Sequence, residues 1–424
     1  MKEFPGPDAR MWLAKNKKYY ATNTQTSLIV PDEEKSHLSV IVDVDGFQFI
    51  DLKCGAGVSN LGHQHKSTNI RHFEHHDGPV PSAIEFAEIL AETAPVKKPA
   101  KVFFCNSGAE ANEAARKACQ AFRFHDGERY SRNKAIYCVN GFAGRTMGVL
   151  SATTSKAKVQ RDPFITDEEL ARSIYIPYPT KENSRQIIDT LRGLDLRWVD
   201  RNLIELFCQG EGGIIPADEE TVRYLYDELQ KMGIFWITDA VQCGMGRTGS
   251  LFGYDFSWLE SDLLTMGKAL GDGLPIGAVI FNANLDWRPG EHSNTFGGNP
   301  TVMRAGISAF FEIKRLVESG EVKKVEQVLR DWLHFFAAGH RDLITEVRGI
   351  GAMWAVEFAT PEMRNRFREV AENMTVSHGM GLALLGCGEK AVRIMPPLNI
   401  GLVELKAAMY LFGLALEDLS RVTS

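Results

Sequence analysis

The sequence lacks the features that mark membrane-spanning, secreted and nucleic-acid-binding proteins. No uninterrupted apolar stretch approaches the roughly 18 residues needed to cross a bilayer. The first residues, MKEFPGP, lack the apolar core of a signal peptide. The formal net charge is −6 and no long run of Lys or Arg occurs, so we expect neither a nucleic acid nor an anionic membrane as a partner.

Cysteine is sparse and scattered, which argues against a disulfide framework. The seven cysteines include no Cys-x-x-Cys pair. Cys105, Cys138 and Cys208 lie in apolar runs that are typical of buried strands. An odd number of buried thiols fits a reducing compartment, so we expect a cytoplasmic protein.

A metal centre is not predicted either. The nearest approach to a ligand pattern is a pair of histidine clusters, His63-x-His65 and His75-His76. Zinc sites usually combine histidine with cysteine or acidic ligands at short spacings, and no such cluster accompanies these histidines. We therefore expect no bound metal.

The chain is long enough for more than one structural unit. Its 424 residues are 44% hydrophobic, which allows a large buried core. Alternation around Asp45-Gly46 predicts a β-hairpin over residues 40–52. After about residue 300, long helical stretches, strand-like segments and a closing helix indicate a smaller α+β domain. We predict three parts: an N-terminal segment (1–60) that packs with the small domain, a large domain (61–300) and the small domain (301–424).

The middle of the chain alternates between apolar strands and helical patterns. One helix carries an apolar face formed by Ala111, Ala114, Ala115, Ala118, Cys119 and Phe122. A second helix begins at Asp218 and ends at Gly233. Continuously apolar strands separated by helices predict a parallel sheet covered on both faces. The candidate strands are residues 101–105, 135–139, 203–208, 234–238, 263–266 and 276–281.

Ligands of such sheets bind beyond the carboxyl ends of the strands, and three polar motifs lie there. The first, Asn106 to Glu110, follows a strand and opens a helix. Ser107 and Glu110 have the spacing of a capping box, so a plain helix cap explains them. A phosphate site explains them equally well, because a helix N-terminus attracts anions and Gly108 lets one approach the backbone.

The second motif is Asp239 at the end of a very apolar strand, where an unpaired carboxylate costs free energy. Asp239 could cap the next helix or form a structural ion pair. It could also face a cationic ring nitrogen, which a carboxylate would keep protonated so that the ring accepts electrons.

The third motif places Lys268 in a glycine-rich loop between two strands. Gly267, Gly271 and Gly273 leave room for a planar ring and a turning backbone. A lysine in such a loop is usually a solvated surface residue. In a desolvated site it could instead form a Schiff base with a cofactor.

Taken together and in this order, the motifs resemble those of the class III pyridoxal-phosphate-dependent aminotransferases. This family includes the 4-aminobutyrate, ornithine and acetylornithine aminotransferases. The resemblance covers nearly the whole chain and implies an α/β protein of fold type I, with a mostly parallel central sheet and a smaller α+β domain. The segments that carry it are GVSNLGH from Gly57, SGAEANEA from Ser107, GFAGRT from Gly141, QGEGG from Gln209, DAVQ from Asp239, GRTG from Gly246, Lys268, and NTFGGNP from Asn294.

The resemblance implies a role for each matching residue around pyridoxal 5'-phosphate (PLP). The implied phosphate ligands are Ser107, Gly108 and Ala109, joined by Thr295 from the neighbouring subunit of a homodimer. The residues implied around the ring are Phe142, which stacks on it, Asp239 at its nitrogen, Val241 beneath it, Gln242 at its oxygen, and Lys268 as the covalent attachment point. The implied substrate ligands are Arg393, its switch partner Glu211, and Arg145.

Three positions depart from the family pattern. Ala240 replaces the usual Glu after the aspartate, Ala143 replaces a frequent His or Trp, and Lys66 replaces a common Pro. None of these changes removes a catalytic group. Ala143 and Ala240 enlarge the space near the cofactor and so bear on the choice of substrate.

The resemblance implies a ping-pong aminotransferase. The amino group of an amine or amino acid, with a 4-aminobutyrate-like ω-amine favoured, would pass to a 2-oxo acid such as 2-oxoglutarate. Lys268 would act as general base and then acid.

Three alternative functions are compatible with some of these motifs. An amino-acid racemase or epimerase would keep the same cofactor residues, but no second acid or base is evident. A non-catalytic PLP-binding regulatory protein would have no need of both Lys268 and Asp239. A Rossmann nucleotide-binding enzyme would require a G-x-G-x-x-G motif in the first strand-to-helix turn, and none is there.

Overall fold

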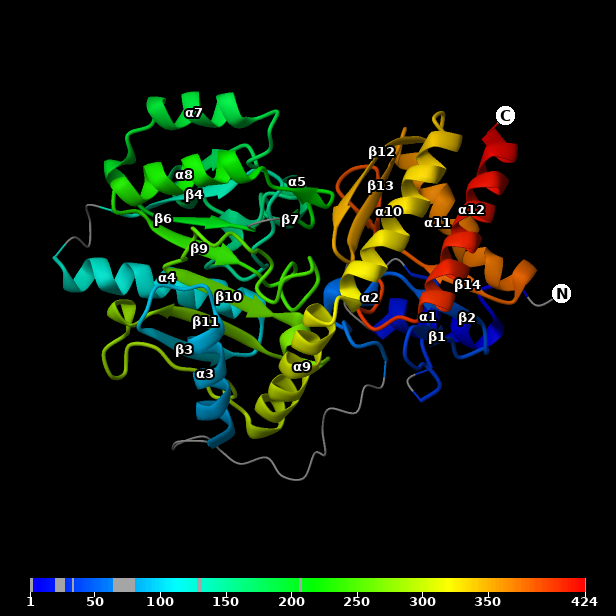
Figure 1. Cartoon of the computed structure of the whole chain (residues 1–424), viewed down its shortest axis with the longest axis horizontal. Helices are drawn as coiled ribbons and strands as arrows, with labels where there is room; N and C mark the ends of the chain where they lie inside the picture. The colour runs from blue at the N-terminus through cyan, green and yellow to red at the C-terminus, as the bar shows by residue number, and fades with distance from the viewer. Residues whose placement is uncertain are drawn as a thin grey trace. The chain divides into compact units, whose positions relative to one another are not determined.

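The computed structural model describes residues 3–19, 27–32, 34–63, 81–127, 132–205 and 208–423. Contacts divide the chain into two compact units (Figure 1). Unit 1 comprises Met1–Lys66 and Glu318–Ser424, and unit 2 comprises Ser67–Val317. No helix among the described residues is both long and apolar enough to span a membrane.

Unit 2 is built on a seven-stranded sheet of order β3-β11-β10-β9-β6-β4-β5. β11 runs antiparallel to both of its neighbours, and every other adjacent pair is parallel. This confirms the mostly parallel sheet that the sequence predicts. The strands are β3 (Ala100–Cys105), β4 (Lys134–Cys138), β5 (Ser173–Ile176), β6 (Val199–Ile204), β9 (Phe235–Asp239), β10 (Leu263–Gly267) and β11 (Gly277–Asn282), and a separate small sheet pairs β7 (Cys208–Gln209) with β8 (Ile215–Pro216).

Two of these strands differ from the prediction. The apolar segment 203–208 is not one strand, because β6 already ends at Ile204 and begins at Val199. The first half of β6 contains the charged residues Asp200 and Arg201, and both side chains are buried. Their ion pair at 2.6 Å offsets the cost of burying the two charges. The apolar pattern could not reveal this half, nor did it reveal β5.

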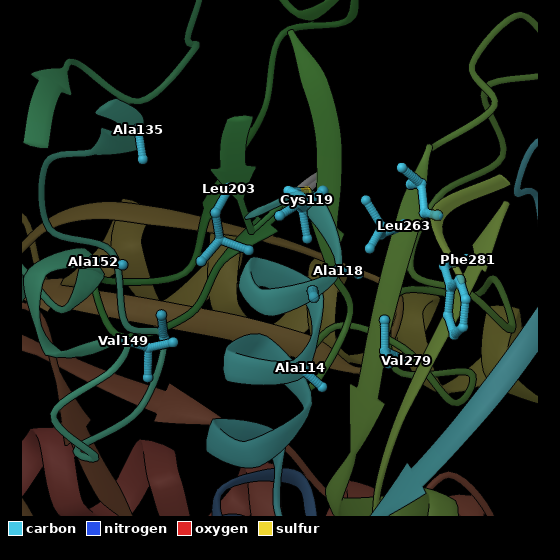
Figure 2. Packing of buried hydrophobic residues seen from close by; sticks show 14 of the residues in the cluster. Ala114, Ala118, Cys119, Ala135, Val149, Ala152, Leu203, Leu263, Val279 and Phe281 are labelled. Carbon is cyan, nitrogen blue, oxygen red and sulfur yellow. The ribbon is translucent and has the colours of Figure 1, made fainter. Parts of the chain in front are cut away.

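Helices cover both faces of the sheet. Trp236 of β9 contacts Tyr226 of α8, whereas the next residue, Ile237, packs in the cluster that contains Ala114 and Ala118 of α4 (Figure 2). Successive strand residues point to opposite faces, so α8 and α4 lie on opposite sides. The helices of unit 2 are α3 (Pro81–Thr93), α4 (Gly108–His125), α5 (Ala157–Gln160), α6 (Asp167–Ala171), α7 (Ser184–Gly193), α8 (Glu219–Lys231) and α9 (Pro300–Glu318), with 3-10 turns η1 (Leu150–Ala152), η2 (Leu196–Trp198), η3 (Lys268–Gly271) and η4 (Ala283–Leu285).

The predicted apolar face of α4 is confirmed. Ala111, Ala114, Ala115, Ala118 and Cys119 are fully buried, and Phe122 is half-buried. Figure 2 shows Ala114, Ala118 and Cys119 beside Leu203, Leu263 and Val279 of the sheet. Small side chains let the helix backbone approach the strands closely. α9 follows the predicted domain boundary at residue 300, yet Phe310 of this helix contacts Phe86 of α3, which groups α9 with unit 2.

Unit 1 combines two small sheets with three long helices. The expected hairpin is confirmed: β1 pairs with β2 around Gly46, whose φ is +82°, and β2 also pairs with β14. Phe412 of α12 packs against Phe336 of α10 and Phe367 of α11. The elements are α1 (Pro7–Tyr19), β1 (Val40–Val42), β2 (Gln48–Asp51), α2 (Cys54–Gly57), α10 (Glu321–Gly339), β12 (Ile344–Ile350), β13 (Met353–Phe358), α11 (Pro361–His378), β14 (Gly381–Ala383), β15 (Leu385–Cys387), β16 (Ala391–Ile394) and α12 (Leu402–Thr423).

Candidate active site

The three polar motifs of unit 2 meet at one edge of the sheet. Gly277 at the start of β11 pairs with Cys105, the last residue of β3, and with Gly267, the last residue of β10. On the other side of β10, Thr265 pairs with Asp239, the last residue of β9. This register places the start of α4, the Lys268 loop and Asp239 beside one another.

The N-terminus of α4 has the open donors that an anion site needs. The Ser107 side chain caps the helix by accepting a hydrogen bond from the Glu110 N–H at 3.2 Å, as predicted. The other half of the expected capping box differs, because Glu110 accepts from the Asn106 N–H at 2.7 Å rather than from the cap residue. The first N–H groups of a helix have no partner within the helix, and those of Gly108 and Ala109 belong to this set.

Lys268 directly follows Gly267, the last residue of β10, and Gly267 lies against this helix start. A Cβ built on Gly267 would come 3.4 Å from the Gly108 backbone nitrogen. Lys268 itself adopts a left-handed backbone with φ of 50°, which L side chains rarely adopt. Backbone strain of this kind is concentrated at functional sites, so the conformation favours a functional lysine over a solvated surface residue.

Asp239 is 4% exposed and accepts two hydrogen bonds. Its Oδ1 accepts from the Val241 N–H at 2.9 Å, and its Oδ2 accepts from the Asn112 side chain at 2.7 Å. Burial raises the pKa of the Asp239 carboxyl, and these two donors and the Lys268 charge offset only part of that increase. The protein itself only partly offsets the cost of burying the Asp239 carboxylate. A cation bound beside Asp239 would therefore be stabilised by this carboxylate.

Phe142 approaches the same place from the loop that follows β4. It lines a small pocket together with Ala143, Glu205 and Asp239. The guanidinium carbon of Arg145 lies 5.9 Å from the centre of the Phe142 ring. The structure thus places the predicted stacking residue near Asp239, with the predicted carboxylate ligand beside it.

Glu205 is a second carboxyl group in this pocket, and the sequence motifs did not indicate it. It accepts hydrogen bonds from the Phe142 N–H at 3.0 Å and the Gly210 N–H at 3.4 Å. Burial and the charges of Asp239 and Glu211 raise the pKa of Glu205 to about 8. Glu205 therefore keeps its proton to a higher pH than a solvated glutamate does.

Val241 and Gln242 lie in the turn after β9. A Cβ built on Gly108 would come 2.5 Å from a methyl carbon of Val241, so this residue packs against the helix start. Gln242 is half-buried one residue later. Packing against Val241 therefore requires glycine at position 108.

The remaining predicted residues are not brought together within one unit. Glu211 is half-buried in unit 2, in the turn that follows β7. Arg393 lies on β16 of unit 1, is 1% exposed, and donates to the Gly386 carbonyl oxygen at 3.4 Å. The Glu211–Arg393 switch therefore stays a prediction. Thr295 is exposed on a loop fastened to the end of β3 by Asn294, whose Nδ2 donates to the Phe104 carbonyl oxygen at 2.8 Å.

Of the residues in the two histidine clusters, the structure describes His63. His63 lies 2.9 Å from Asp51, a buried carboxylate of unit 1. Although burial raises the pKa of Asp51, the His63 hydrogen bond and nearby positive charges bring it below its usual value. His65, His75 and His76 lie outside the described residues.

Two further residues complete the site, and the sequence motifs did not indicate them. Asn112 on α4 is 2% exposed and contacts Asp239, and Thr265 of β10 is fully buried and contacts Asn112. A signal for Asn112 was available. It lies one helical turn after Gly108 and one before the buried Ala115, so a polar side chain interrupts an apolar stripe.

Comparison with known proteins identifies the family. The class III aminotransferase family profile matches residues 19–416. Acetylornithine aminotransferase from Listeria monocytogenes serotype 4b is 32% identical over 400 residues, covering 90% of this chain and 93% of that protein. The acetylornithine aminotransferase of Bacillus anthracis is 32% identical over 392 residues, covering 89% and 92%.

Solved structures share the fold. Ornithine aminotransferase from Toxoplasma gondii ME49 aligns with a TM-score of 0.83 at 23% identity, over 97% of this chain and 96% of that one. An omega transaminase from Pseudomonas jessenii aligns with a TM-score of 0.83 at 23% identity, over 96% and 98%. The fold predicted from the motifs is thereby confirmed as that of the PLP-dependent aminotransferases, fold type I. With a profile that spans nearly its whole length and relatives above 30% identity, this chain belongs to the class III aminotransferases, which depend on pyridoxal 5'-phosphate.

Proposed function

We propose that the protein transfers the amino group of a terminal (ω) amine to a 2-oxo acid, with 2-oxoglutarate as the acceptor. The observation that carries this proposal is the meeting of Lys268, Asp239 and the α4 N-terminus at one sheet edge. These groups supply an amine, a buried carboxylate and a set of N–H donors within one site.

The residues present fit PLP. The N–H groups of Gly108 and Ala109 and the capped helix end suit a phosphate. Asp239, whose pKa is raised by burial, suits a protonated ring nitrogen. Val241 and Phe142 provide apolar surfaces for a planar ring, and the bound cofactor supplies the capacity to delocalise electrons from the substrate carbon.

Lys268 has two tasks in this proposal. Its amine would hold the cofactor covalently in the resting protein. Once freed by the amino donor, the amine would take a proton from the substrate carbon that bears the nitrogen and would later return a proton. Asp239 would keep the ring nitrogen protonated, because the buried carboxylate is most stable beside a cation.

Substrate carboxylates would be read by arginine. A guanidinium binds a carboxylate through two parallel hydrogen bonds. We assign Arg393 to the α-carboxylate of the acceptor and Arg145 to a second carboxylate. Glu211 would neutralise Arg393 when an ω-amine without an α-carboxylate binds.

The donor is proposed from the relatives. Those that are about a third identical are named acetylornithine aminotransferases, and structural neighbours include ornithine aminotransferases and an omega transaminase. Acetylornithine and ornithine share a primary amine at the end of an aliphatic chain. 4-Aminobutyrate, the donor favoured by the sequence motifs, has the same feature and remains one of the candidates.

We also propose a homodimer with shared sites, in which Thr295 contacts the phosphate bound by the partner subunit. The exposed position of Thr295 on a loop fastened to β3 supports this assignment, since the loop is held in place while its tip faces outward.

The decisive experiment is a donor screen with the PLP-loaded protein and 2-oxoglutarate. N-acetylornithine, ornithine, 4-aminobutyrate and branched-chain amino acids are offered singly, and glutamate formation and donor racemisation are both measured. Glutamate from at least one ω-amine, absent with Lys268→Ala, is the expected result. Racemisation without glutamate would replace the proposal by the isomerase alternative.

A further inference from the structure

We propose that Asn112 is a positioning residue that holds the Asp239 carboxylate in the orientation and ionisation state that the cofactor ring nitrogen requires. This inference rests on the proposed function. It assigns a role to a side chain outside the set that would touch the cofactor or substrate.

Asn112 is the centre of a buried hydrogen-bond network. Its Nδ2 donates to Asp239 Oδ2 at 2.7 Å and to the Ala143 carbonyl oxygen at 2.9 Å. Its Oδ1 accepts from the Thr265 hydroxyl at 2.7 Å. Asn112, Asp239 and Thr265 are all buried, so solvent cannot readily replace these bonds.

The network fixes which end of the amide faces Asp239. The Ala143 carbonyl oxygen can only accept, so the amide nitrogen of Asn112 must face it. The same nitrogen carries the second N–H, which points to Asp239. The Thr265 hydroxyl donates to the amide oxygen on the other side, and a flipped amide would lose both bonds to the acceptors Asp239 and Ala143.

This arrangement favours the ionised form of Asp239. An N–H donor stabilises a carboxylate and does not accept the proton of a carboxylic acid. Asp239 has one such donor on each oxygen, Val241 on Oδ1 and Asn112 on Oδ2. Removal of Asn112 takes this donor away from Oδ2. The effect of burial, which raises the pKa of Asp239, is then offset less.

Asn112 also joins three chain segments that carry site residues. Thr265 lies three residues before Lys268 on β10, Ala143 directly follows Phe142, and Asp239 ends β9. One side chain therefore links the lysine strand, the stacking loop and the carboxylate. The helical position of Asn112 makes this link independent of the substrate.

The test compares Asn112→Leu, which keeps the volume and removes the hydrogen bonds, with wild type. Asn202→Leu is the matched control, since Asn202 is fully buried on β6 and its amide atoms have no hydrogen-bond partner among the described residues. Each protein is loaded with PLP labelled with ¹⁵N in the ring, and the ¹⁵N chemical shift, kcat, KM and thermal midpoint are measured.

We expect Asn112→Leu to move the ring ¹⁵N shift toward that of an unprotonated pyridine. We also expect kcat to fall about 10- to 100-fold while KM changes by less than about threefold, as expected for a contact that acts only in the chemical step. Asn202→Leu is expected to keep the wild-type shift and kcat. A wild-type shift and kcat in Asn112→Leu would overturn the proposal, even if its thermal midpoint falls.

Asn112→Asp provides a second measurement if the leucine variant does not fold. The new carboxyl group is isosteric but can donate to Asp239 only when protonated, so turnover and the ring ¹⁵N shift should recover toward wild type as pH is lowered. A pH profile that matches wild type would overturn the proposal. The wild-type protein separates this test from that of the proposed function, because absent transamination in wild type counts against the function alone.

Discussion

Gly277 offers a direct test of how the sheet register builds the phosphate site. It lies on β11 between the ends of β3 and β10, and a Cβ built there would meet the Ser107 carbonyl oxygen at 2.1 Å and Cys105 Sγ at 2.6 Å. Real Cβ contacts are not shorter than 3.0 Å. In Gly277→Ala the Ser107 peptide must therefore move by about 1 Å, because the strand itself is held on both sides.

The displacement falls on the backbone that would hold the cofactor phosphate. Forcing one extra methyl group into a packed site costs about 1–3 kcal/mol. If the strain is relieved by moving the helix start, PLP affinity should fall about 5- to 150-fold. Pyridoxal, which lacks the phosphate, should lose much less affinity because it uses Lys268 and the ring contacts alone.

The assay is a titration of the cofactor-free protein with PLP and with pyridoxal, followed by visible absorbance. Gly193→Ala is the matched control, since a Cβ on this residue at the end of α7 meets no heavy atom within 4 Å. Wild-type PLP affinity and thermal midpoint in Gly277→Ala would refute the argument. An equal loss of affinity for PLP and for pyridoxal would show that the substitution disturbs Lys268 or the ring contacts instead of the phosphate site.

Five further predictions concern individual residues or a pair of variants. Asp239→Asn should retain cofactor but lose turnover at least about 100-fold, because an amide cannot hold the ring nitrogen protonated; near-normal turnover with cofactor bound would contradict the role. Lys268→Ala should lose the covalent absorbance band. Mixing it with Thr295→Ala should restore activity, whereas no recovery despite subunit exchange would argue against shared sites. Arg393→Lys should weaken 2-oxo acid use by about 2 kcal/mol and spare the ω-amine half-reaction, and equal loss in both would favour a plain salt bridge. Burial raises the pKa of Glu372 from 4.5 to about 7, so the folded state holds a proton that the unfolded state releases. The contribution of Glu372 to the free energy of unfolding should therefore be greatest below pH 4.5, and it should fall by about 3 kcal/mol as the pH rises through 7. Glu372→Gln should lack this pH-dependent fall when the free energy is measured by urea unfolding.

Local physics explains why much of the site was predictable from sequence. The cap at Ser107, the apolar face of α4 and the hairpin around Gly46 each depend on residues within one or two turns of chain. The order of strand, polar residue and helix likewise predicted that Asp239 ends a strand and that Lys268 lies in a loop between strands, beyond the carboxyl ends of the strands. These sequence patterns depend on residues that are close in the chain, so they can be recognised without knowledge of the fold.

The partners of buried polar groups were not predictable from the sequence. The charged residues Asp200 and Arg201 made the first half of β6 look unlike a buried strand. In the structure this half is buried because the two side chains form an ion pair. Glu110 was expected to bond the cap residue and instead reaches Asn106. In both cases the partner choice depends on geometry that spacing alone leaves open.

The sequence by itself determined α4, α8 and the long helices after residue 300, most strands of the central sheet, and the family. Only the tertiary structure decided which distant residues share a hydrogen bond. Asn112 and Asp239 are 127 residues apart, and Asn112 and Thr265 are 153 residues apart. Their contact arises because β9 and β10 pair in parallel and α4 crosses them, and strand pairing is set by the packing of the whole sheet rather than by any local pattern.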